Sequence, residues 1–269
     1  MPETRSIMDI YRHLDGINCR KCNEKTCLAF AAAVYQKKRE PTECPHLDGA
    51  RIGGGTAASE DKKAAEPDLE KTLDVLKRAA RTSDLARKAE LTGGAYDGNR
   101  LHLRILGKKF SIDANGKIAA DIHINPWVVL PVVDYLFHGA GLEATGDWVP
   151  FRELENGGPR EGLFLQRCER PLKKIADLNT DLFGHLIELF SGKAVANDYG
   201  SDISLVLHPF PKLPLLICYW KPEDGMDSGL HFYFDRTADK NMRTEAIYTM
   251  VAGFVTMIEK IALNHGWRR

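Results

Sequence analysis

The sequence predicts an α+β protein in which a small helical module precedes a larger mixed α/β domain with antiparallel hairpins. Three observations lead to this prediction. Cysteines crowd into the first 44 residues, and a stretch rich in glycine, alanine and charged residues follows. Beyond it, strand-like runs are grouped between helical patterns, which is typical of α+β chains rather than of doubly wound parallel sheets. We therefore predict a module over residues 1–48, a flexible linker over 49–67 and an α+β domain over 68–269.

Composition narrows the function classes. The chain has 269 residues, with 37 Lys+Arg balanced by 37 Asp+Glu, so nothing in its net charge favours nucleic acid or an anionic membrane surface as a partner. No continuous apolar run reaches the roughly 18 residues that a membrane span needs. The first 15 residues carry charges throughout, so we expect no signal peptide and a cytoplasmic location. Thiols stay reduced there, which favours metal binding over disulfides.

Two short helices are predicted to frame the cysteines. Residues 6–16 place apolar side chains on one face and stop at Gly16. Residues 27–38 are rich in alanine and free of glycine and proline until Pro41. A loop carries three cysteines between these helices, and the segment after the second helix returns the fourth, Cys44. All four thiols are therefore expected at one end of the helix pair.

The cysteine spacing C-x2-C-x4-C-x16-C predicts one 4Fe-4S cluster. Its expected ligands are Cys19, Cys22, Cys27 and Cys44. A cysteine at the start of a helix is favoured as a thiolate, and a proline after the last cysteine is common in bacterial ferredoxins. Structural zinc is the main alternative, but zinc sites ordinarily use two paired C-x2-4-C knuckles, and here a whole helix separates the last two cysteines. Free thiols are the remaining alternative.

Residues 9–46 resemble the four-cysteine iron–sulfur module of the large subunit of the corrinoid iron–sulfur protein and of the Rnf complex B subunit. The shared pattern is Asn18-Cys19, Cys22, Thr26-Cys27, Ala29-Phe30-Ala31 and Cys44-Pro45. The resemblance implies one low-potential 4Fe-4S cluster held by the four cysteines. One departure is visible, because the loop of those families carries glycine near the second cysteine, where this chain has Lys21 and Asn23.

In the larger domain, periodicity predicts helices over 68–92, 126–139, 172–190 and 244–262. Pro131 is expected to break or kink the second of these helices. Strands are predicted over 101–106, 109–113, 117–122, 204–208, 215–220 and 230–234, with hairpin turns at Gly107 and Asn115-Gly116. Residues 146–154 are predicted to form a strand or a loop edge.

This domain resembles a family of uncharacterised domains of anaerobic bacteria and archaea that is often fused behind the same module. The motifs that carry the resemblance include Asp198-Tyr199-Gly200-Ser201-Asp202, His208-Pro209, Tyr219-Trp220 and Phe234-Asp235-Arg236-Thr237-Ala238-Asp239. This resemblance implies the domain architecture but no activity.

Other candidate sites in the domain are weaker. The loops 198–202 and 220–225 are expected at the ends of neighbouring strands, where a ligand site or ordinary strand termini are both consistent with the pattern. Cys218 reads as a core residue and Cys168 as a more exposed one. Four histidines beside apolar segments read as structural, although any one could be an axial ligand to a tetrapyrrole. They are His123, His138, His208 and His231.

Together these patterns predict an iron–sulfur electron-transfer protein of anaerobic metabolism. The cluster would pass electrons at low potential to a partner or to a cofactor such as a corrinoid. The expected partner is a redox protein, either a ferredoxin-like donor or a corrinoid protein. One alternative is a redox enzyme whose larger domain binds a substrate or tetrapyrrole. The other is a non-redox interaction protein with a structural or sensing cluster. No hydrolase, dinucleotide or kinase motif is present in the sequence.

Overall fold

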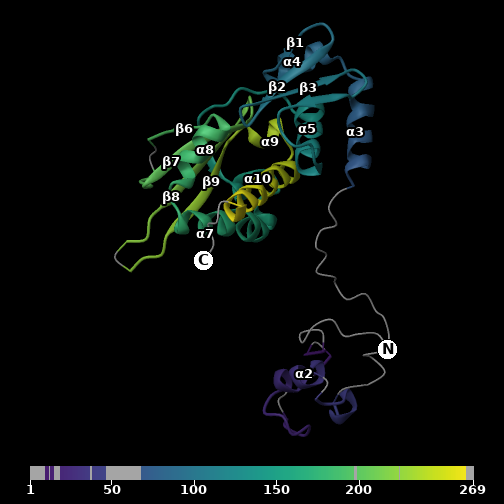
Figure 1. Ribbon diagram of the computed structural model, residues 1–269, viewed down its shortest axis with the longest axis vertical. Coiled ribbons are helices and arrows are strands. Elements are labelled where there is room, and N and C mark those ends of the chain that lie inside the picture. Colours follow the sequence, from purple (N-terminus) through teal and green to yellow (C-terminus); the bar gives the residue numbers. More distant parts are fainter. Residues whose placement is uncertain are drawn as a thin grey trace. The chain divides into compact units, whose positions relative to one another are not determined.

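The computed structural model describes residues 10–11, 13–14, 19–36, 38–46, 68–196, 199–223 and 225–264. The chain divides into two compact units, Met1–Ala65 and Glu66–Arg269. Helices and antiparallel sheets build the described chain, so the predicted α+β class is confirmed (Figure 1). The predicted linker, residues 49–67, lies outside the described residues.

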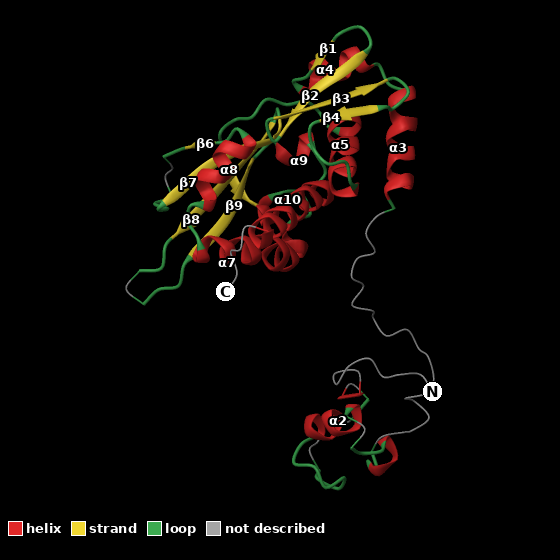
Figure 2. Ribbon diagram, viewed as in Figure 1, coloured by secondary structure: helices red, strands yellow, loops and turns green. Residues whose placement is uncertain are grey.

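The described part of the first unit is helical and contains no strand (Figure 2). Helix α2, Cys27–Tyr35, begins where predicted and ends three residues early, and a 3-10 turn follows at Pro41–Glu43. Most of the predicted helix over 6–16 lies outside the described residues, but Ile10 and Leu14 are buried against Phe30 and Ala31 of α2. These side chains and the cysteines form a small core of their own.

The second unit contains two antiparallel sheets within its described residues. The first sheet has the order β1-β2-β3-β4, with β1 at Ala95–Tyr96, β2 at Arg100–Ile105, β3 at Lys108–Asp113 and β4 at Ile118–Ala120. A two-residue turn, Leu106 and Gly107, joins β2 to β3. Both of its residues have positive φ, 48° and 74°, which matches the twist of a tight hairpin. The predicted hairpins at Gly107 and Asn115-Gly116 are confirmed.

The second sheet has the order β5-β9-β8-β7-β6. Its strands are β5 at Trp148–Pro150, β6 at Lys193–Ala194, β7 at Ile203–Phe210, β8 at Leu213–Trp220 and β9 at Gly229–Asp235. The central strand β8 is buried from Leu213 to Tyr219, so both of its faces are covered. Such a strand reads as a continuous apolar run, which is why the sequence located it correctly.

Helices pack around these sheets (Figure 1). They are α3 at Leu69–Arg81, α4 at Leu85–Thr92, α5 at Pro126–His138, α6 at Glu161–Phe164, α7 at Arg170–Leu178, α8 at Leu182–Phe190, α9 at Ala238–Asn241 and α10 at Thr244–Asn264. Helix α5 runs through Pro131, which does not end it. Helix α10 contacts both α5 and α7.

Two predicted helices are each divided in the structure. The helix predicted over 68–92 breaks at 82–84 because Asp84 caps a new helix, its side chain accepting a hydrogen bond from the Arg87 amide at 3.1 Å. The helix predicted over 172–190 breaks at 179–181, where the Asn179 side chain accepts from the Asp181 amide at 2.9 Å. Leu178, before the break, is exposed, whereas Leu182, after it, is buried, so the two segments do not share one continuous apolar face.

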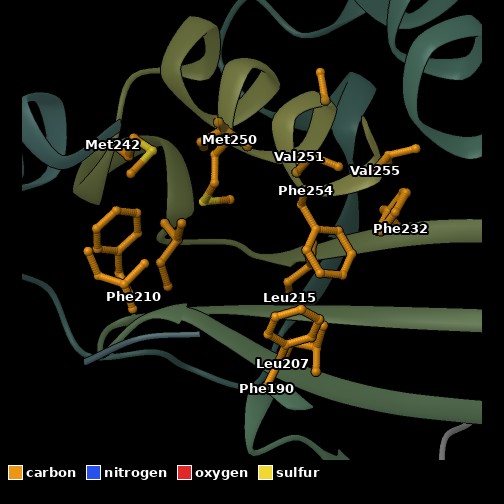
Figure 3. Packing of buried hydrophobic residues seen from close by; sticks show 14 of the residues in the cluster. Phe190, Leu207, Phe210, Leu215, Phe232, Met242, Met250, Val251, Phe254 and Val255 are labelled. Carbon is orange, nitrogen blue, oxygen red and sulfur yellow. The ribbon is translucent and has the colours of Figure 1, made fainter. Parts of the chain in front are cut away.

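Helix α10 is long and apolar enough to cross a membrane, by length and composition, over Thr244–Leu263. Half of that window is buried inside the unit, as is usual for the core helix of a globular domain. Figure 3 shows Val251 and Phe254 of this helix directed toward Leu215 of β8, within the main core. Burial therefore accounts for its apolar character.

Candidate iron–sulfur site

The structure brings the four predicted cysteines together around one hollow in the first unit. Cys22, Cys27 and Cys44 are buried and Cys19 is partly exposed. Leu14 and Phe30 form the apolar side of the hollow, which contains about 320 Å³ of space not filled by protein atoms, including the part open to solvent. Among the described residues, no three His, Cys, Asp or Glu side chains meet at the close spacing that one metal ion needs.

Helix α2 positions Cys27 at its first residue. Thr26 is the N-cap, and its hydroxyl accepts a hydrogen bond from the Ala29 amide at 3.0 Å. The helix therefore begins on the cysteine itself, so the positive end of its dipole lies at this residue.

Backbone conformation shapes the loop around Cys22. Arg20 and Asn23 both have positive φ, 59° and 61°, and the Asn23 amide donates to the Arg20 carbonyl at 3.1 Å. Asparagine adopts this left-handed conformation more readily than most residues other than glycine. Asn23 thus occupies a position of the kind where glycine is favoured, which gives a physical reason for the departure noted in the sequence.

Arg39 connects the cysteine loop to the turn that precedes Cys44. Its guanidinium lies 2.7 Å from Glu43 and 3.7 Å from Glu24. Glu43 in turn accepts from the Glu40 amide at 2.8 Å and so closes the 3-10 turn. The two parts of the site are therefore joined by side chains at its rim.

The donor set suits an iron–sulfur cluster. Burial raises the pKa of the Cys44 thiol, a hydrogen bond from the His46 backbone opposes this, and the neighbouring cysteines raise it further. Four thiolates in one partly apolar hollow would repel one another, so iron bound there would stabilise them. Four cysteine thiolates are also the usual ligand set of a 4Fe-4S cluster.

The remaining cysteines lie in the second unit, and both are fully buried. Cys218 is a core residue of β8, as predicted. The expected exposure of Cys168 was wrong, because Cys168 lies on a π-helical segment, Leu165–Glu169, that turns it into the main core. Burial raises the pKa of the Cys168 thiol far above its ordinary value, so this sulfur is protonated and unreactive.

The four histidines singled out in the sequence are all exposed. They do not share a site, because His123, His208 and His231 line three different hollows and His138 lies at the end of α5. The tetrapyrrole ligand stays a prediction.

The two predicted loops do lie at neighbouring strand ends, since the Lys221 amide donates to Asp202 at 2.7 Å. Asp198 and Asp224 lie outside the described residues.

Sequence reasoning missed one polar pair in the second unit. Glu169 is nearly buried, and its carboxylate lies 3.1 Å from Nδ1 of His231 and accepts from the Phe232 amide at 3.1 Å. These residues are 62 positions apart, so no local motif marks them. The one local feature that could have drawn attention to Glu169 is the π-helical segment that ends there, and its amino-acid composition does not distinguish it from an ordinary helix.

Comparisons with known protein families match two separate segments of the chain, one before and one after the predicted linker. Residues 14–46 match the family described as "Putative Fe-S cluster", and residues 84–257 match the family described as "Domain of unknown function (DUF3786)". No solved structure matches the chain.

Similar proteins named acetyl-CoA decarbonylase/synthase complex subunit gamma occur in several archaea. The protein of Methanothermobacter thermautotrophicus is 48% identical over 42 residues, which is 16% of this chain and 9% of that protein. The Methanocaldococcus jannaschii protein is 42% identical over 48 residues, 18% of this chain and 10% of that protein. The Methanosarcina mazei protein is 31% identical over 75 residues, 28% and 16% of the two chains. The chain thus spans only about a tenth to a sixth of these relatives.

The predicted resemblance of the N-terminal segment to an iron–sulfur module is therefore confirmed, as is the presence of an uncharacterised domain behind it. The relatives cover the iron–sulfur region, whereas the DUF3786 match covers well over half of the chain. On these grounds the chain belongs to the DUF3786 family and carries an iron–sulfur cluster segment ahead of that domain.

Proposed function

We propose that this protein transfers single electrons through one 4Fe-4S cluster held by Cys19, Cys22, Cys27 and Cys44. The observation that carries the proposal is the gathering of these four thiols around one partly apolar hollow in a segment that matches an iron–sulfur family. When bound, such a cluster supplies a one-electron redox couple. The remaining residues of the segment bind, orient and shield it.

Individual residues of the segment have separate roles in this proposal. Phe30 and Leu14 exclude water from one side of the hollow, which influences the potential of a bound cluster. The start of α2 places the positive end of the helix dipole at Cys27. Cys19, the one ligand that is partly exposed, would give electrons the most direct route to a partner.

The partner we propose is a redox protein with an acidic surface. Arg20, Lys21 and Lys25 are exposed on the loop that carries the cysteines, and such positive charge attracts and orients an acidic partner. A ferredoxin-like donor or a corrinoid protein would fit this role. The relatives are named as subunits of a complex, which supports a protein partner. A reducing cytoplasm is the proposed location, because it keeps the four thiols available to iron.

The test is spectroscopy and elemental analysis of the full chain, purified without oxygen. We expect about four iron and four sulfide per chain, a broad charge-transfer absorption, and an electron paramagnetic resonance signal after reduction. Cys44→Ser should lose most of the iron. Cys168→Ala is the matched control, because that cysteine is buried in the other unit, and it should keep its iron.

Two results would contradict the proposal. Zinc at one atom per chain, with neither sulfide nor charge-transfer absorption, would establish a structural zinc site instead. Equal loss of iron in the Cys44 and Cys168 variants would remove the assignment of ligands. Electron transfer is tested separately by rapid mixing of the reduced protein with an acidic ferredoxin, where rising salt should slow the reaction.

A further inference from the structure

A second hollow lies in the DUF3786 domain, where nothing in the relatives assigns a site. It has a volume of about 470 Å³ and is bordered by the β2–β3 turn, the start of α5, the β7–β8 hairpin and the second half of α10. Ligand pockets in proteins commonly have volumes of about 300–1,000 Å³. The hollow is therefore large enough for a small organic molecule.

Its walls are mainly apolar. Phe210, Leu215 and Phe254 form the buried floor, and Phe254 meets Phe190 edge to face with ring centroids 5.6 Å apart. Figure 3 shows Phe254 extending from α10 toward Leu215 of the larger sheet. This floor is rigid, because each ring also packs into the main core.

Nearer the opening, apolar side chains remain partly exposed to water. Trp127 and Val128 at the start of α5, and Met257 and Ile261 on α10, line the hollow and are only partly buried. Close packing of the two helices fixes this wall, since a side chain at Gly253 would meet Trp127 at 2.7 Å. A ligand that covered this surface would gain the free energy of removing it from water.

The charges around the hollow have one sign. Lys108 and Lys260 are the charged residues that line it, and no aspartate or glutamate is among its lining residues. Within the described part of the chain neither lysine has an ion-pair partner. The amino-terminal end of α5, a helix of 13 residues, also lines the hollow and adds partial positive charge. An otherwise apolar hollow is thus electrostatically complementary to an anion.

From the apolar floor and the cationic lining together, we propose that this hollow binds an amphipathic organic carboxylate. Its apolar chain or ring would lie against Phe210, Phe254 and Trp127, and its carboxylate would meet Lys108 and Lys260. This role is separate from electron transfer at the cysteine segment. It would make the DUF3786 domain a carrier or sensor of such a molecule.

Calorimetric titration of the full chain with three probes tests the proposal. Dodecanoate has both the chain and the charge, dodecanol has the chain alone, and acetate has the charge alone. We expect dodecanoate to bind about tenfold or more tightly than dodecanol, the factor expected of contacts to a charged group. Acetate should not bind measurably. Added salt should weaken the binding of dodecanoate and leave that of dodecanol unchanged.

Variants separate the two parts of the site. Lys108→Gln combined with Lys260→Gln should abolish the preference for dodecanoate while leaving dodecanol binding intact. Met257→Gln, on the partly exposed wall, should weaken both probes equally. Lys109→Gln is the matched control, because successive side chains of β3 point to opposite faces and Lys109 lines a different hollow. It should change neither affinity.

Three outcomes would overturn the proposal. The first is binding of dodecanoate weaker than about 1 mM, which is below the range of a specific site. The second is equal affinity for dodecanoate and dodecanol in the unmodified protein. The third is a loss of the charge preference in Lys109→Gln as large as in the double variant, which would indicate a general surface effect. Iron content, measured in the same samples, keeps these outcomes independent of the cluster.

Discussion

Replacing Asp235 with asparagine tests whether the motif around it is structural. Asp235, at the end of β9, is fully buried. One carboxylate oxygen accepts from the amides of Thr145 and Gly146 at 2.8 and 2.7 Å. The other accepts from the Thr237 amide at 3.0 Å and from its hydroxyl at 2.7 Å. The carboxylate thereby fastens the chain before β5 to the turn after β9.

The expected loss follows from counting donors. In Asp235→Asn one oxygen becomes an NH2 group, so at least one backbone amide faces another donor, whichever way the side-chain amide lies. The Thr237 hydroxyl can turn and accept instead. A hydrogen bond to a charged group contributes about 1.5–3 kcal/mol. Because Thr145 and Gly146 are partly reached by water, we expect the free energy of unfolding to fall by about 2–4 kcal/mol. The midpoint temperature should fall by about 5–15 °C for a domain of this size.

Urea unfolding, followed by tryptophan fluorescence, measures the loss, since all four tryptophans lie beyond residue 126. The control is Asp202→Asn, an exposed carboxylate that accepts one amide, from Lys221. Its change should stay within about 0.5 kcal/mol. A loss in Asp235→Asn no larger than that of the control would refute the reasoning. An altered dependence on urea concentration would instead indicate a changed unfolded or native state.

The pH dependence supplies a second test of the same network. Burial acts to raise the pKa of Asp235, but the hydrogen bonds from Thr237, Thr145 and Gly146 outweigh it and hold the pKa below 3.8. The stabilisation is therefore present above pH 3.8 and is lost as the pH falls through the folded-state pKa. The difference in stability between the natural chain and Asp235→Asn should be largest near neutral pH and should shrink in acid. A difference that grows in acid would contradict this account.

Two further predictions concern other residues. Asn23→Gly should retain iron and thermal stability, whereas Asn23→Val should lose both. The reason is that φ is 61° at this position, where a β-branched residue is strained. Equal iron content in the two variants would count against this account. Glu169→Gln should lower the pKa of His231, which the side-chain hydrogen bond of Glu169 raises, and the imidazole shift in a nuclear magnetic resonance pH titration measures it. Because the pKa of His231 is raised in the folded protein, His231 contributes stability at low pH that is lost as the pH rises through that pKa. In Glu169→Gln the free energy of unfolding should therefore depend less on pH across this range. A His231 titration that does not shift in Glu169→Gln would exclude the pairing.

Local patterns located most of the elements correctly. The strand over 215–220 and the helix over 244–262 are apolar runs of the right length, and each is found within two residues of its predicted ends. The two divided helices were predicted wrongly where a short polar residue interrupts the helical pattern. The side chains of Asp84 and Asn179 each accept a hydrogen bond from a nearby backbone amide. Such bonds compete with the backbone hydrogen bonds of a helix, and hydrophobic periodicity does not reveal them.

By itself, the sequence determined which segment matches an iron–sulfur family, because its four cysteines lie at a recognisable spacing within one short stretch of chain. It also determined the α+β class, because turns and apolar periods are local signals. Only the tertiary structure decided what surrounds the remaining residues. The burial of Cys168, the pairing of Glu169 with His231 and the cation-lined hollow beside α10 all join positions far apart in the chain. Which distant side chains meet depends on how helices and sheets pack, and no pattern in a single stretch of sequence records that packing.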